Sequence, residues 1–168
     1  VFMELIIDPV CSIAFESEAE EEGIMNRTPR NTATGFFAWR NFWGSLLGGL
    51  GALMFVVIIY IYEARAFGSV GEARALAFCS LIIANLLLVF SSLSKKRGVL
   101  RVIIERNRAA LFISGVAVFV LALSILVNPI ADLFRFEQPS LLRYWVVVFG
   151  GGLFLFYLEG IKKIKSGA

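Results

Sequence analysis

Two acidic residues in an apolar segment are the first candidates for chemistry. Glu4 and Asp8 lie four positions apart within residues 1–15, and Pro9 follows directly. On a helix this spacing places both carboxylates on one face, one turn apart. Pro9 cannot donate a hydrogen bond to the carbonyl of Leu5, and a carbonyl freed at membrane depth needs protein, water or an ion as its partner. Carboxylates beside a free carbonyl suit calcium, magnesium, sodium or a proton, so we interpret Glu4 and Asp8 as cation ligands.

The alternative for these two residues is that they lie near a helix end and face water. Acidic side chains inside a membrane helix are rare and usually functional, which favours the ligand interpretation. Asn85 is the third candidate, because it lies in the middle of a long apolar run. A lone amide at such a position often hydrogen-bonds to a neighbouring helix, so its spacing leaves helix packing and ion coordination both open.

Motifs of soluble enzymes are absent from the sequence. It has no histidine, no P-loop and no nucleophile elbow, and its two cysteines, Cys11 and Cys79, lie in apolar stretches without CxxC spacing. We therefore predict neither a catalytic residue nor a bound cofactor in this chain, and we interpret the cysteines as packed thiols.

The elements that position the candidates follow from composition. Of the 168 residues, 58% are hydrophobic, more than in an ordinary soluble domain. Charge-free or nearly charge-free runs long enough to cross a bilayer predict four membrane-spanning helices. We place these helices at about 41–62, 75–94, 109–131 and 141–161.

The apolar segment 1–15 precedes these four spans. It is too short to cross a membrane and lacks the basic start of a signal peptide, so we expect the chain to begin partway through a transmembrane helix of a longer protein. The predicted fold class is an all-α membrane protein, a partial transmembrane helix followed by a four-helix bundle over 41–168.

Basic residues predict the orientation of the chain. The formal net charge is +3, and 12 of the 16 Lys and Arg residues fall in 16–40, 94–108 and 162–168, which an even number of crossings separates. By the positive-inside rule, these segments and the C-terminus are cytoplasmic. This distribution accounts for the excess of basic over acidic residues, so we predict no nucleic-acid partner. The loop 95–108 is interpreted as a topology loop rather than a lipid-headgroup site.

Short motifs along the chain resemble cation-transporting P-type ATPases from the sixth transmembrane helix to the C-terminus. They are MELIIDP at 3–9, Phe15, IMNRTPR at 24–30, ANLLLVFSSLS at 84–94, Asn107, and Glu159 with Lys162. The resemblance covers essentially the whole chain and is strongest to the bacterial calcium-pump-like branch. It implies that 1–15 belongs to the sixth helix, that 16–40 is a cytoplasmic loop, and that the four spans are helices seven to ten.

The resemblance also implies roles for the three candidates. Asp8 matches the ion-ligand aspartate of the sixth helix, Glu4 the polar ligand position one turn earlier, and Asn85 a polar position of the eighth helix that contributes to one ion site. The sequence departs from calcium pumps at Ile7, where they have threonine, at Glu4, where asparagine is typical, and at Asn85, where animal pumps have an acid.

The expected function is therefore part of an ATP-driven cation pump in a bacterial plasma membrane, which carries calcium or a related cation. ATP and magnesium would bind to missing upstream domains, since the DKTGT and TGE motifs are not in this chain. The expected partners are the bilayer, those upstream domains and the transported cation. The alternative is a standalone four-helix membrane scaffold or a proton-coupled exporter.

Overall fold

Helices form the part of the chain that the computed structural model describes, namely residues 12, 16, 39–93 and 108–166. The long helices are α2 (Trp39–Phe67), α3 (Val70–Leu93), α5 (Arg108–Leu126) and α7 (Tyr144–Ser166). A short helix, α6 (Asn128–Phe134), and a 3₁₀ turn, η2 (Leu141–Arg143), connect α5 to α7. Within these ranges there is no β-strand, so the predicted all-α membrane fold is confirmed.

Three of the helices are long and apolar enough to cross a membrane. These segments are Phe42–Phe67, Val70–Ser92 and Leu141–Lys163. They correspond to the predicted spans 41–62, 75–94 and 141–161, with the first helix extending further at its end and the second beginning earlier. The extensions meet in a short turn, so α2 and α3 form a tight antiparallel hairpin.

The turn between α2 and α3 consists of Gly68 and Ser69. Gly68 has a φ of 72°, the left-handed conformation that ends many helices and that glycine adopts at little cost. Ser69 then caps α3, because its hydroxyl accepts a hydrogen bond from the Glu72 backbone N–H at 3.1 Å. The sequence Ser69 to Glu72 thus has the spacing of a capping box, although the Glu72 side chain points elsewhere.

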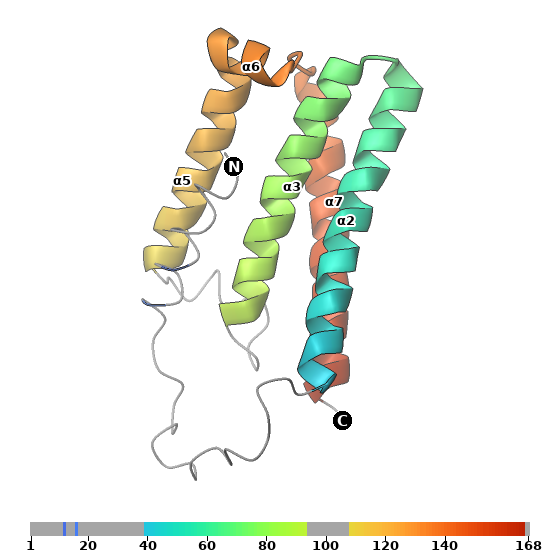
Figure 1. The fold of residues 1–168 in the computed structure, drawn as a ribbon, viewed down its shortest axis with the longest axis vertical. Helices are drawn as coiled ribbons and strands as arrows, with labels where there is room; N and C mark the ends of the chain where they lie inside the picture. The colour runs from blue at the N-terminus through green and yellow to red at the C-terminus, as the bar shows by residue number, and fades with distance from the viewer. Residues whose placement is uncertain (1–11, 13–15, 17–38, 94–107, 167–168) are drawn as a thin grey trace.

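Helices α2, α3 and α7 pack side by side and enclose most of the buried core (Figure 1). Small residues allow them to approach closely. A Cβ atom at Gly51 would lie 2.3 Å from the Tyr157 ring, and one at Gly150 would lie 2.5 Å from the Phe55 ring. The Tyr157 hydroxyl donates a hydrogen bond to the Leu47 carbonyl at 3.0 Å, which links α7 to α2.

The third predicted span, 109–131, is broken in the structure. Helix α5 ends at Leu126, and α6 turns away from it by 85° (Figure 1). Pro129 explains the break, because its ring would clash with the carbonyl of Ile125 in a continuous helix and it has no N–H to donate. It instead occupies the first turn of α6, where a missing N–H costs nothing.

Aromatic side chains fasten α6 and the loop after it to α3. The rings of Phe78, Phe134 and Phe136 contact one another, with centroids 5.3 to 6.0 Å apart. Large apolar side chains elsewhere on the helices remain exposed, such as Leu53 on α2 and Phe149 on α7. In a bilayer these faces contact lipid chains or neighbouring helices, so their exposure agrees with a membrane bundle.

Candidate functional site

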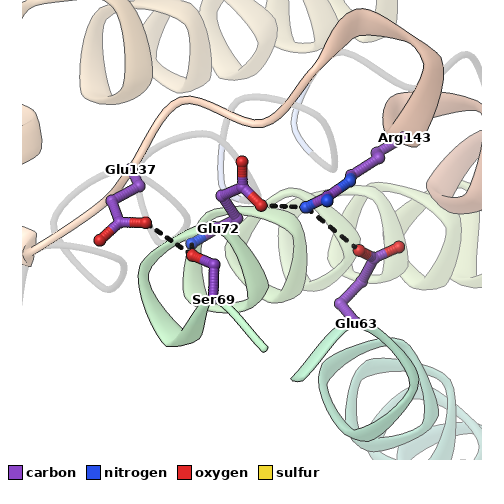
Figure 2. A network of polar contacts seen from close by, with 5 residues as sticks. All are labelled: Glu63, Ser69, Glu72, Glu137 and Arg143. Carbon is purple, nitrogen blue, oxygen red and sulfur yellow. Dashed lines mark hydrogen bonds and ion pairs between the residues drawn. The ribbon is translucent and has the colours of Figure 1, made fainter. Parts of the chain in front are cut away.

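The polar contacts at one end of the bundle form a cluster, which we call the turn-end cluster (Figure 2). Its members come from four elements that meet where α2 turns into α3. They are Glu63 on α2, Ser69 and Glu72 at the start of α3, Glu137 in the loop after α6, and Arg143 in η2.

Arg143 is the centre of this cluster. Its Nη1 donates a hydrogen bond to Oε2 of Glu72 and lies 3.9 Å from Oε2 of Glu63. The guanidinium carbon lies 3.7 Å from the centroid of the Phe67 ring, a cation–π contact at the end of α2. One side chain therefore ties the start of α7 to both helices of the α2–α3 hairpin.

A second set of contacts joins the loop after α6 to the same hairpin. The Ser69 hydroxyl donates to Oε2 of Glu137 at 2.6 Å while it also caps α3. Gly71 makes this approach possible, because a Cβ atom there would lie 2.6 Å from the Glu137 side chain. Two carboxylates, those of Glu72 and Glu63, thus lie near the Arg143 guanidinium, while the carboxylate of Glu137 is bound to Ser69.

Glu63 differs from the other acidic residues of the cluster in its burial. Its side chain is 1% exposed, whereas that of Glu72 is 21% exposed. Neither carboxylate oxygen of Glu63 has a hydrogen-bond partner among the described residues. Burying a carboxylate without hydrogen-bond partners costs free energy, so the position of Glu63 requires an explanation that the other side chains of the cluster do not.

Asn85 is the one predicted cation ligand that the structure describes. It lies in the middle of α3 and is half-buried. It shares a helix face with Phe78, which is two turns earlier and contacts the aromatic rings of α6 and its loop. Ile83, by contrast, packs against the core shared with α2 and α7, so Asn85 lies on a different face of α3 from that core.

Glu4 and Asp8 lie outside the described residues, so the predicted meeting of these carboxylates with Asn85 stays a prediction. Among the side chains that are described, no group of three His, Cys, Asp or Glu residues comes close enough to hold a metal ion. Cys79 is a buried free thiol, in agreement with the interpretation of this residue as a packed side chain.

Sequence reasoning missed the turn-end cluster, because its charged residues come from separate segments of the chain. Glu63 and Arg143 are 80 positions apart, so no local spacing connects them. The available signal was that charged residues interrupt or flank three separate apolar segments at the same predicted membrane face. Such residues are candidates for pairing with one another, because unpaired charges near the bilayer core are expensive.

Comparison with known proteins identifies the family. Residues 1–164 match the family described as "Cation transporting ATPase, C-terminus". No curated protein matches the chain. The match covers nearly the whole sequence and includes Glu4, Asp8 and Asn85. Together with the helical membrane fold, it shows that this chain belongs to the family formed by the C-terminal membrane portion of cation-transporting P-type ATPases.

Proposed function

We propose that Glu4, Asp8 and Asn85 supply part of the cation-binding site of an ATP-driven pump, and that the cation is calcium or a related ion. The observation that carries this proposal is the family match over residues 1–164, which includes the acidic, proline-containing segment around Asp8. Carboxylate, amide and backbone carbonyl oxygens together form the kind of donor set that hard cations prefer.

The position of Asn85 supports its part in this proposal. It lies at mid-span, so its amide oxygen is at the depth at which transporters hold their ions. Its face of α3 differs from the face that packs into the core shared with α2 and α7, so that core does not occupy it. Under the proposal, this face contacts the helix that contains Glu4 and Asp8.

In the complete pump the ion ligands would act as a switch. Phosphorylation in the cytoplasmic domains, with ATP and magnesium bound there, would favour one arrangement of the membrane helices over another. Asp8 would bind the cation and balance its charge in the inward-facing state, and would release the cation in the outward-facing state. The described bundle of α2, α3 and α7 would support the moving helices.

The test is phosphoenzyme formation from ATP at increasing cation concentration, with the full-length pump. Asp8→Asn keeps the side-chain shape and removes the charge that offsets the dehydration of the ion, so ion-dependent phosphorylation should be lost. Glu4→Gln should weaken it less, since a neutral oxygen remains. Asn85→Ala should have the smallest effect, about 1 kcal/mol if the amide only bridges helices.

Protease resistance of each variant is the folding control in this experiment. A wild-type ion dependence in Asp8→Asn would remove Asp8 from the site. Parallel titrations with calcium, magnesium, manganese and sodium identify the ion. The transported cation is the one that has the lowest half-saturating concentration in the wild type and whose effect on phosphorylation is lost in Asp8→Asn.

The orientation of the chain is a second part of the proposal. We propose that the C-terminus is cytoplasmic, because 12 of the 16 basic residues lie in segments assigned to that side. The resemblance to the bacterial calcium-pump-like branch is what supports a bacterial plasma membrane. Single cysteines at the exposed positions Gln138 and Lys163, in a chain with Cys11 and Cys79 replaced by serine, report the two faces. An impermeant thiol reagent added to intact cells should label Gln138→Cys alone, and labelling of Lys163→Cys instead would reverse the orientation.

A further inference from the structure

Glu63 lies close to the end of the first described span and is buried there without hydrogen-bond donors. Its side chain is 1% exposed, and both oxygens lack a hydrogen-bond partner among the described residues. An ionised carboxylate in this place has lost its water without gaining donors, and the cost of that exchange is several times that of burying a neutral acid. The burial of Glu63 therefore favours its neutral form.

Arg143 does not compensate for this loss in the observed arrangement. Its Nη1 is 3.9 Å from Oε2 of Glu63, which is beyond hydrogen-bonding distance, and the same nitrogen is hydrogen-bonded to Glu72. Figure 2 shows the Glu63 carboxyl group directed at Arg143 from a different side than Glu72. The guanidinium is thus already neutralised by a partner that is better placed.

Among the described residues, the charged groups that face Glu63 come from two elements. Glu72 acts on it from α3 and Arg143 from η2. On α2 itself Arg65 is exposed, and the charged residues of α7 begin only at Glu159, four turns from its start. If both glutamates were ionised, one guanidinium would face two negative charges, so the group is more stable with one neutral carboxyl.

We propose that Glu63 is a proton-binding site, which holds its proton while Arg143 pairs with Glu72. Release breaks the O–H bond of the carboxyl group, leaves the electron pair on the Glu63 oxygen and transfers the proton to water. The new carboxylate then attracts Arg143, which keeps its own charge throughout. Proton release is therefore linked to a shift of the guanidinium from Glu72 towards Glu63, that is, from α3 towards α2.

The test is infrared difference spectroscopy of the full-length pump in lipid at neutral pH. A protonated carboxyl group has a C=O stretching band that a carboxylate lacks. The wild-type spectrum should contain one such band that disappears in Glu63→Gln. Glu137→Gln, a change at an exposed acid of the same cluster, is the matched control and should leave the band unchanged.

Two further variants separate a proton site from an ordinary ion pair. Arg143→Gln removes the cation and should leave the Glu63 band in place. Glu72→Gln frees Arg143 to pair with Glu63, so the band should decrease. The proposal would be overturned if every band of protonated carboxyl groups remained in Glu63→Gln, or if the Glu63 band disappeared in Arg143→Gln. If Glu63→Gln does not fold, the opposite responses of Arg143→Gln and Glu72→Gln still decide the question, and none of these readouts depends on the cation site at Asp8.

Discussion

Two parts of the bundle are held together in different ways. Helices α2, α3 and α7 contact one another along much of their length, and glycines on α2 and α7 allow side chains of the neighbouring helix to approach the backbone. Helix α5 has a glycine as well, Gly115, but a Cβ atom there would have no neighbour within 4 Å among the residues that the structure describes. Helix α5 is packed against this trio near α6, where Ile125 joins the core and aromatic rings pack on α3.

The difference follows from the solvent in which the helices pack. Lipid chains are as apolar as leucine, so burying apolar side chains against each other gives little advantage in a membrane. Close backbone approach and satisfied polar groups are then the remaining sources of helix association. The trio α2, α3 and α7 uses both, through its glycines and through the Arg143–Glu72 pair of the turn-end cluster, whereas α5 and α6 contact the trio through apolar side chains such as Ile125 and through the aromatic rings near α6.

The largest effect on stability is expected at Gly150 of α7, against which the Phe55 ring of α2 packs. Gly150→Ala places a Cβ atom 2.5 Å from the Phe55 ring, which is 8% exposed and stacks on Phe154 at 5.7 Å, so the ring cannot turn away. Overpacking of this kind should lower the free energy of unfolding by about 1–3 kcal/mol. The measurement is an SDS titration of the full-length pump in detergent micelles, followed by tryptophan fluorescence.

Gly115→Ala is the matched control for this change. Because no described residue would crowd the new Cβ atom, the higher helix propensity of alanine should dominate and raise the free energy of unfolding by up to about 1 kcal/mol. Equal destabilisation by the two substitutions would show that α5 is packed as tightly as the trio, and the comparison between the two parts would fail.

A smaller loss is expected at the turn that joins α2 to α3. Gly68→Ala meets no neighbouring atom, but the φ of 72° is unfavourable for any residue with a Cβ atom. The backbone penalty should lower the free energy of unfolding by about 1–2 kcal/mol, and the same SDS titration measures it. No change in the midpoint would mean that the turn adopts another conformation at negligible cost.

The sequence was sufficient to predict the helical class and the approximate spans, because the length of an apolar run is itself the physical requirement for crossing a bilayer. It was less informative about α5. Pro129 is a residue that ends helices and so accounts for the break, yet the place where α6 packs depends on Phe78 of a distant helix. The environment of Glu63 likewise depends on Arg143, and pairing across 80 residues has no local signature.

The smallest effect is expected at the end of α6, where the structure uses a residue that is poorly suited to its conformation. Arg135 has a φ of 53°, and the Phe136 N–H donates to the Ala131 carbonyl at 2.8 Å, the pattern of a helix terminus that usually contains glycine. Arg135→Gly should relieve the backbone strain but add flexibility to the unfolded chain, for a net gain of about 0.5 kcal/mol in the free energy of unfolding. Because α6 and the loop after it contact Phe78 of α3 through Phe134 and Phe136, the gain should increase protection of α6 in amide hydrogen exchange more than that of α2. Arg135→Ala separates the two contributions, since it keeps the strain and removes only the charge. A gain from Arg135→Ala equal to that from Arg135→Gly would show that the guanidinium, and not the left-handed backbone, is what weakens this end of α6.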